Sequence, residues 1–196
     1  MAFQEKIPNG FYLVSSVRTA DKIEAPRGAL RYMRPDDMGA VAFKAAIERV
    51  PGLEASQIDD IIIGCAFPET EQGFNLGRFI AQRAALPNSV PGCTVNRFCS
   101  SGIQTIGMAH QAIVAGHADI IIAGGAESMS LIPMGGDYLA PNPEMIVEAP
   151  QAYCTMGITA DKVAQEYHIS REDQDAFALR THKRALAAIQ QGLFMK

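Results

Sequence analysis

The chain has 196 residues, of which 48% are hydrophobic and 19% are charged, and its formal net charge is −4. This composition is typical of a globular protein of one or two domains and excludes a disordered, collagen-like or coiled-coil chain. The lack of a basic excess argues against a nucleic-acid partner. No stretch approaches the roughly 18 apolar residues of a membrane span, and residues 1–10 lack the apolar core of a secretory signal.

The cysteines predict free thiols rather than disulfides or a metal site. Cys65, Cys93, Cys99 and Cys154 show no C-x-x-C pairing, so neither a disulfide framework nor a zinc site is indicated. Buried free thiols are typical of a reducing compartment. We therefore expect a cytoplasmic protein that uses no metal and no membrane.

Strand-like and helix-like segments alternate through the first half of the chain. Residues 11–17 are rich in β-branched and aromatic side chains and predict a strand. Asp36 and Asp37 are expected to cap the first helix, which ends before Pro51. Its apolar stripe is predicted at Met38, Val41, Ala42 and Ala45.

Three further strands are predicted at 61–63, 93–96 and 119–123. The continuous apolar run at 61–63 indicates a strand that is covered on both faces, as in a parallel sheet. Between the strands we expect a helix capped by Asn75 and a small-residue helix at 99–115. This alternation predicts an α/β fold, a layered βαβαβαβ domain whose sheet is mixed or mostly parallel.

Beyond residue 130 the pattern changes to a long loop and two helices. Residues 131–157 are rich in proline and glycine and predict a loop of a length that is usually functional or disordered. Thr159 is expected to cap the first helix, and Ser170 the second, which ends before Gly192. The last helix is amphipathic and no later element covers it, so we expect a chain that is cut before its fold is complete. The alternative is that this helix packs on the α/β domain.

The segment VNRFCSSGI at 95–103 carries the strongest chemical signal. A strand ends here, the chain turns, and a helix is predicted to begin at Cys99. The positive end of the helix dipole would favour the thiolate form of Cys99. The unpaired N–H groups of the first turn would bind an oxyanion on a carbonyl that the sulfur attacks. From the residues alone, a small packing cysteine explains the pattern equally well.

Three segments, in this order and spacing, resemble the thiolase family. They read VNRFCSSGIQTI, AGGAESMS at 123–130, and MGITADKVAQEYHISREDQDAFA at 156–178. The Cys-Ser-Ser-Gly form is most similar to degradative 3-ketoacyl-CoA thiolases. The resemblance implies the thiolase N-terminal α/β domain at 1–125, part of the helical loop domain at 126–196, and no C-terminal α/β domain in this chain.

The resemblance implies an acyltransferase that uses coenzyme A as a substrate and needs no other cofactor. Cys99 would attack a 3-ketoacyl-CoA, release acetyl-CoA, and pass the acyl group to a second coenzyme A, or would catalyse the reverse condensation. The backbone N–H of Cys99 would form half of the oxyanion hole. The family takes a histidine and a second cysteine from its C-terminal half. His110 lies about 16 Å along the helix from Cys99, so we expect the chain alone to be inactive.

Other positions are assigned lesser roles. The resemblance places Met156, with Thr155 before it, at the acyl and coenzyme A pocket. Asn75 and Arg78 match a position near the family's dimer interface, although a helix cap and a surface charge explain them better. Close backbone approach near the site is expected at Gly102, Gly124 and Gly125. We expect a homodimer or a homotetramer.

Two other interpretations stay open. A ketoacyl synthase-like condensing enzyme acting on carrier-protein thioesters shares the fold and the cysteine, but residues 96–102 and the segment ISREDQDAFA argue against it. The third interpretation is a non-catalytic fragment or interaction module with a relict cysteine. Labelling experiments separate the three interpretations. Labelling of Cys99 by an acyl-CoA favours a thiolase, and labelling only by an acyl carrier protein favours a synthase-like enzyme. Alkylation of Cys99 no faster than that of Cys65 favours the non-catalytic module.

Overall fold

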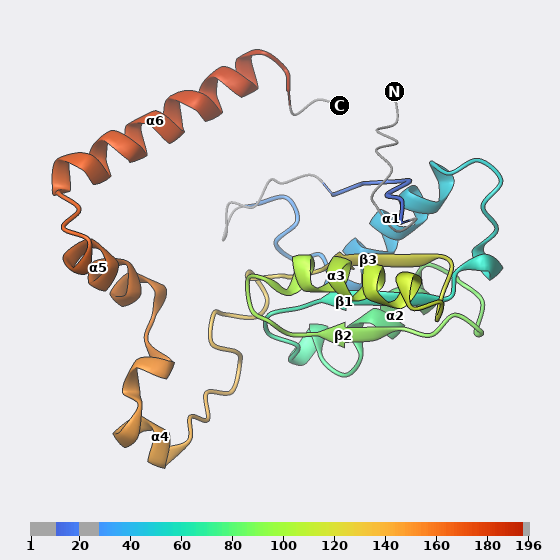
Figure 1. Cartoon of the computed structure of the whole chain (residues 1–196), viewed down its shortest axis with the longest axis horizontal. Coiled ribbons are helices and arrows are strands. Elements are labelled where there is room, and N and C mark those ends of the chain that lie inside the picture. Colours follow the sequence, from blue (N-terminus) through green and yellow to red (C-terminus); the bar gives the residue numbers. More distant parts are fainter. Residues whose placement is uncertain (1–10, 20–27, 194–196) are drawn as a thin grey trace. The chain divides into compact units, whose positions relative to one another are not determined.

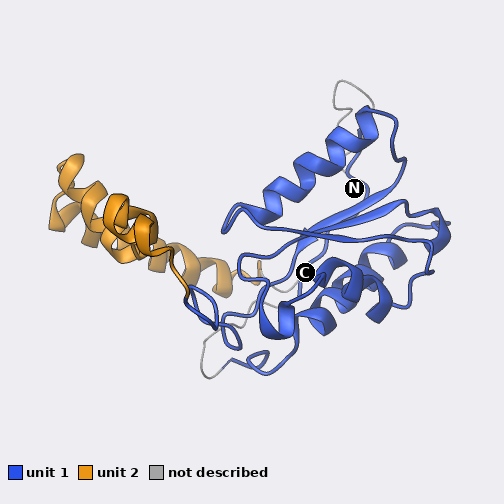
Figure 2. Ribbon diagram, turned by 90° about the horizontal axis from the view of Figure 1, so that it is seen from below, with its two compact units in different colours: residues 1–139 blue, residues 140–196 orange. Residues whose placement is uncertain are grey.

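The structure of the protein is a computed structural model that describes residues 11–19 and 28–193. The chain divides into two compact units, unit 1 at residues 1–139 and unit 2 at residues 140–196 (Figures 1 and 2). Residues 1–10, for which the sequence predicts no secretory signal, lie outside the described residues. The domain boundary after residue 125 stays a prediction.

Unit 1 is built on a three-stranded sheet in the order β2-β1-β3 (Figure 1). The strands are β1 (Asp60–Gly64), β2 (Cys93–Val95) and β3 (Ile121–Gly125). All pairs are parallel, and Ile62 of the central strand is in register with Cys93 and Ala123. The α/β class and the parallel sheet are therefore confirmed.

Helices cover both faces of this sheet (Figure 2). They are α1 (Pro35–Glu48), α2 (Leu76–Arg83) and α3 (Ser101–Val114), with short 3₁₀ turns at Ala55–Gln57 and Thr70–Gln72. The β1–α2–β2 and β2–α3–β3 connections cross the sheet in opposite directions, so right-handed crossovers place α2 and α3 on opposite faces. Asn75 caps α2 as predicted, because its side chain accepts a hydrogen bond from the N–H of Arg78.

The core lies between β1 and the pair α1 and α2. Ile61 and Ile63 are fully buried there, and the other buried residues around them include Phe43, Leu76, Ile80 and Val90. Because side chains alternate along a strand, Ile62 and Gly64 face α3 instead. A Cβ at Gly64 would lie 2.6 Å from the carbonyl carbon of Ser101. The strand is thus covered on both faces, as its continuous apolar run predicts.

The predicted strand at 11–17 is wrong. Residues 11–19 contain no strand, and Tyr12, Leu13 and Val14 are exposed. Strand propensity is realised only where a neighbouring strand supplies the ladder and the side chains pack. In the described part of the chain, the sheet ends at β3.

The predicted stripe of α1 is wrong in part, because Met38, Ala42 and Ala45 are half-buried but do not form the centre of the buried face. The helix begins at Pro35 after the N-cap Arg34, so Asp36 and Asp37 lie in its first turn rather than at its cap. Its buried face contains Gly39, Ala40 and Phe43, whereas Val41 is exposed. The reason is a close contact between α1 and α2, since Gly39 leaves room for the side chain of Ile80.

β3 begins two residues later than predicted. The carboxylate of Asp59 accepts hydrogen bonds from the N–H groups of Asp119, at 2.7 Å, and Ile120, at 3.0 Å. These two N–H groups are therefore not available to the sheet ladder, which starts at Ile121. The bonds from Ile120 and Asp119 lower the pKa of Asp59.

Unit 2 is helical. It contains α4 (Pro143–Glu148), a 3₁₀ turn at Pro150–Tyr153, α5 (Met156–Glu166) and α6 (Arg171–Gln190). The prediction of a loop through 131–157 is therefore wrong in part, because α4 and the 3₁₀ turn lie within it. The side chain of Asn142 caps α4. α5 begins after Thr155 rather than at Thr159. Ser170 caps α6 as predicted, accepting from the N–H of Asp173 at 3.1 Å.

Candidate active site

The candidate nucleophile lies at the carboxyl end of β2. Residues 96–100, here called the nucleophile loop, connect β2 to α3. Cys99 in this loop is a free and exposed cysteine. Ligands of open parallel sheets bind at the carboxyl edge of the strands, so Cys99 stands where a substrate would be expected.

The helix behind the loop starts later than predicted. α3 begins at Ser101 with Ser100 as its N-cap, so Cys99 lies just outside the first turn. The side chain of Ser101 is the cause. Its Oγ accepts from the N–H of Arg97 at 2.8 Å and donates to the carbonyl of Phe98 at 2.6 Å. This pair of bonds folds residues 97–100 into a turn.

Several backbone N–H groups at and just after Cys99 have no hydrogen-bond acceptor among the described residues. Within the described residues, no group accepts a hydrogen bond from the N–H of Cys99, Gly102 or Ile103. Such donors are the ones that a helix start leaves without helical partners. They are available to an oxygen that becomes negative when a carbonyl next to the sulfur is attacked.

The glycines near the site differ in what surrounds them. At Gly125, a Cβ would lie 3.2 Å from the carbonyl oxygen of Gly64, so two strands approach closely there. At Gly102 and Gly124, a Cβ would meet no atom within 4 Å. Gly64 has tighter surroundings than these three glycines, against Ser101, and it was not singled out from the sequence.

A buried polar cluster lies behind the same edge of the sheet. Gln72 is fully buried, and its Nε2 donates to the carboxylate of Glu127 and to the carbonyl of Phe67 at 2.8 Å. Its Oε1 accepts from the N–H of Ser128 at 3.0 Å. Glu127 also accepts from the N–H of Ala66. The cluster joins the chain after β1 to the chain after β3.

Cys65 belongs to this cluster and is chemically unlike Cys99. Its sulfur lies 3.7 Å from a carboxylate oxygen of Glu127. Burial, and to a lesser extent the negative charge of Glu127, raises the pKa of the Cys65 thiol to about 12. Cys65 is therefore a protonated packing thiol at neutral pH.

Sequence reasoning missed this cluster, although a signal for it exists. Glu127 follows β3 directly, and Gln72 lies in the connection that follows β1. Because the carboxyl ends of parallel strands meet at one edge of a sheet, polar residues that follow neighbouring strands are expected to lie close together.

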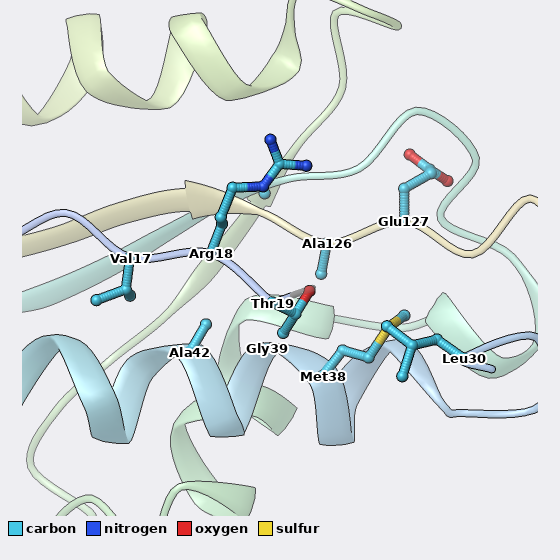
Figure 3. A pocket seen from close by; sticks show the side chains of 10 residues that line it. Val17, Arg18, Thr19, Leu30, Met38, Gly39, Ala42, Ala126 and Glu127 are labelled. Atoms are coloured by element: carbon cyan, nitrogen blue, oxygen red, sulfur yellow. The ribbon is translucent and has the colours of Figure 1, made fainter. Parts of the chain in front are cut away.

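A cavity of about 250 Å³ lies in unit 1 but does not include Cys99 (Figure 3). Glu127 lines it together with Arg18, and Figure 3 shows Leu30, Met38 and Ala42 along another part of its wall. The remaining lining residues are Val17, Thr19, Gly39, Gly125 and Ala126. The cavity thus shares Glu127 with the polar cluster.

The remaining residues that the sequence singled out lie away from the nucleophile loop in the chain, at α2, on α3 and in unit 2. Thr155 and Met156 lie in unit 2, where Thr155 is the N-cap of α5 and Met156 its first residue, 58% exposed. Asn75 acts as a helix cap, and the Arg78 guanidinium donates to the carbonyls of Val90 and Asn88. His110 lies on α3 and packs edge-on against Phe11 at 5.2 Å.

Residues 11–19 and 28–193 contain neither a membrane-spanning helix nor a metal-binding cluster. None of the helices there is long and apolar enough to cross a lipid bilayer. No group of three or more histidine, cysteine, aspartate or glutamate side chains there could hold a metal ion.

Comparison with known proteins decides the family. The profile of the thiolase N-terminal domain matches residues 11–196. The chain belongs to the thiolase family. It is 50% identical over 182 residues to a 3-ketoacyl-CoA thiolase of Bacillus subtilis (strain 168). The aligned region covers 93% of this chain and 46% of that protein.

Other thiolases show the same partial coverage. A 3-ketoacyl-CoA thiolase of Yersinia pestis (strain Pestoides F) is 44% identical over 86% of this chain and 43% of its own length. A β-ketoadipyl-CoA thiolase of Acinetobacter baylyi is 40% identical over 94% of this chain and 50% of its own length. The chain thus spans about half the length of the curated relatives it matches.

Proposed function

We propose that this thiolase chain carries the nucleophile of a 3-ketoacyl-CoA acyltransferase, and that the nucleophile is Cys99. The supporting observation is an exposed free thiol whose own backbone N–H has no acceptor among the described residues. Two of the similar thiolases described above are named for 3-ketoacyl-CoA, which supports this substrate class. Coenzyme A enters as a substrate, and no metal or further cofactor is required.

The proposed reaction uses two groups of Cys99, its sulfur and its backbone N–H. Its sulfur forms a bond to the keto carbon of the substrate, and the N–H of Cys99 donates to the oxygen that becomes negative. The bond between the second and third acyl carbons breaks. The two-carbon carbanion takes up a proton and leaves as acetyl-CoA. Covalent catalysis thereby divides one difficult step into two.

The second step returns the enzyme to its starting state. The thiol of another coenzyme A attacks the acyl thioester on Cys99, the shortened acyl-CoA leaves, and the Cys99 sulfur regains its proton. The N–H groups of Gly102 and Ile103, which have no acceptor among the residues that the structure describes, are further donors at the start of α3. We assign Met156 and Thr155 to the pocket for the acyl chain and coenzyme A, an assignment supported by the exposure of Met156 at the start of α5.

The proton transfers need groups that the described part of unit 1 does not place at Cys99. His110 lies on α3, three turns from the thiol, and His117 follows the end of that helix. Cys65 cannot exchange a proton near neutral pH, because burial raises the pKa of its thiol to about 12. We therefore propose that this chain alone accepts an acyl group on Cys99 but does not turn over.

We also propose a cytoplasmic homodimer or homotetramer. Four free cysteines support a reducing compartment. β2 lies at an edge of the sheet, and unpaired strand edges favour association. Phe74, which is 94% exposed, adds apolar surface in the connection between β1 and β2.

The test is the transfer of an acetyl group from acetyl-CoA to the purified chain, located by peptide mass spectrometry. We expect acetylation of Cys99 over hours, released again by excess coenzyme A, and none in Cys99→Ala. Cys154 in the same sample is the internal control for unspecific acetylation.

Two results would point elsewhere. Acetylation of Cys99 only by an acetylated acyl carrier protein would favour a ketoacyl synthase-like enzyme. Equal alkylation rates at Cys99 and Cys65, with no acetylation of either, would favour a module without catalysis.

A further inference from the structure

The side chain of Asn96 joins the nucleophile loop to the end of the central strand. Its Oδ1 accepts from the N–H of Phe98 at 2.8 Å, and its Nδ2 donates to the carbonyl of Ala66 at 2.9 Å. The first bond closes a local turn of the kind that asparagine side chains form with the backbone two residues ahead. The second bond links this turn to the chain that leaves β1.

Phe98 adopts a backbone conformation that needs such support. Its φ is +45°, in the left-handed region, which is sterically unfavourable for a non-glycine residue. Asn96 accepts a hydrogen bond from the N–H of Phe98. The carbonyl of Phe98 accepts hydrogen bonds from both Oγ and the N–H of Ser101. Because Phe98 immediately precedes Cys99, its backbone angles direct the N–H of Cys99.

Ala66 is itself fixed by buried groups. Its N–H donates to Glu127, which is also bound by the fully buried Gln72. The bond from Asn96 to the Ala66 carbonyl therefore connects the exposed loop to a cluster that the sheet and the core hold in place. The ends of all three strands are joined by this chain of hydrogen bonds.

We propose that Asn96 is a positioning residue for acyl transfer, an inference that rests on the proposed role of Cys99. Attack on a thioester requires the sulfur and the N–H of Cys99 to reach the same carbonyl group. Alkylation requires only an accessible thiol. Asn96 fixes the backbone that relates the two groups, so its loss reduces acylation far more than alkylation.

The experiment measures both reactions on the intact chain. In the first, the Cys99 sulfur bonds to the acetyl carbon of acetyl-CoA, the bond to the coenzyme A sulfur breaks, and coenzyme A takes the proton. In the second, iodoacetamide alkylates the same sulfur. Peptide mass spectrometry gives both rates, and thermal unfolding reports stability.

Two substitutions of Asn96 separate its two bonds. Asn96→Ala removes both. Asn96→Ser keeps a short neutral acceptor for the N–H of Phe98 but cannot reach Ala66. The control is Asn75→Ala. Asn75 also accepts a backbone N–H, that of Arg78, and donates to a carbonyl, that of Gly92, but its hydrogen bonds reach no residue of the nucleophile loop.

We expect Asn96→Ala to lower the acetylation rate at least ~10-fold, as small displacements of reacting groups do, and to change alkylation by less than about twofold. Asn96→Ser should be intermediate. Asn75→Ala should lower the melting temperature and leave the ratio of the two rates unchanged. Because Asn96→Ser keeps the local turn, the ratio of the two rates can still be measured in this variant if Asn96→Ala fails to fold.

The outcomes distinguish this inference from the proposed function. If the unaltered chain is acetylated and the ratio of rates in the Asn96 variants equals that of the unaltered chain, the positioning role is overturned and the role of Cys99 stands. The same conclusion follows if Asn75→Ala shifts the ratio equally. If Cys99 of the unaltered chain is never acetylated, the proposed function fails and the positioning role fails with it.

Discussion

Unit 1 and unit 2 are stabilised in different ways. Unit 1 covers β1 with helices on both faces, and Ile61 and Ile63 are completely removed from solvent. In unit 2 none of the described residues is buried, and α4, α5 and α6 consist of exposed or half-exposed side chains. Long-range packing therefore determines the first unit, and local interactions determine the helices of the second.

The local interactions of unit 2 are visible at its helix ends. Asn142 caps α4, and Ser170 caps α6. An ion pair joins Arg171 to Asp175 one turn along α6. Interactions of this kind contribute about 1 kcal/mol or less each. Helices without tertiary packing are only marginally stable in water, so substitutions in the two units should differ in their effects.

The largest difference is expected between matched apolar truncations. Ile61→Ala removes a side chain that is 0% exposed, and Leu179→Ala removes one that is 56% exposed. The first should lower the free energy of unfolding by about 2 to 5 kcal/mol through lost burial and a cavity, and the second by less than about 0.5 kcal/mol. Urea titrations followed by circular dichroism measure both. Equal losses would show that α6 has tertiary packing after all.

Thiol reactivity gives a second comparison. Cys65 of unit 1 is buried, and burial raises its pKa to about 12, whereas Cys154 of unit 2 is half-exposed. At pH 8 we expect iodoacetamide to alkylate Cys65 ~100-fold more slowly than Cys154, because the thiolate is the reactive form. Comparable rates in the folded chain would contradict the burial of Cys65.

The same pKa predicts a pH dependence of stability. The unfolded thiol loses its proton near its ordinary pKa of 9.0, and the folded thiol keeps it until about 12. The folded state therefore binds more protons between these values, and the stability of unit 1 should fall as the pH rises through this window. Cys65→Val removes this contribution and is the control. An identical slope in both proteins would refute the prediction.

The buried polar cluster provides the third comparison. Gln72→Ala leaves the carboxylate of Glu127 and the N–H of Ser128 without their buried partner. We expect a loss of about 1 to 3 kcal/mol, the usual effect of unsatisfied buried groups. Gln82→Ala, on the exposed side of α2, should change stability by less than about 0.5 kcal/mol. A smaller loss for Gln72→Ala than for Gln82→Ala would mean that water replaces the amide.

The sequence predicted those features that depend on short segments. The run Ile61-Ile62-Ile63 is itself the evidence for a buried parallel strand, and Asn75 and Ser170 are recognisable as caps from their own positions. The residues of segment 95–103 predicted a strand end and a helix start at Cys99, and family resemblance assigned this cysteine as the nucleophile. The structure places Cys99 between β2 and α3 with its thiol exposed. These signals need no knowledge of distant contacts.

The features that were missed depend on distant partners. The buried face of α1 is set by the contact between Gly39 and Ile80. The start of α3 is an exception, because Ser101 sets it through bonds to Arg97 and Phe98, which lie only four and three residues earlier. Gln72 and Glu127 are far apart in the chain and meet only because the sheet is parallel. Within its own segment neither residue differs from a solvated polar one, and the signal emerges only when both are placed after strands of one parallel sheet.

The smallest of these effects concerns a cap in unit 2. Ser170→Ala removes the acceptor for the N–H of Asp173, which lies 3.1 Å from Oγ. We expect α6 to lose about 1 kcal/mol at this end, seen as faster amide hydrogen exchange at residues 171–174. Since the helices of unit 2 are stabilised locally, exchange in β1 and β3 should not change. Faster exchange in these strands would show that the two units unfold together, and the contrast between them would then fail.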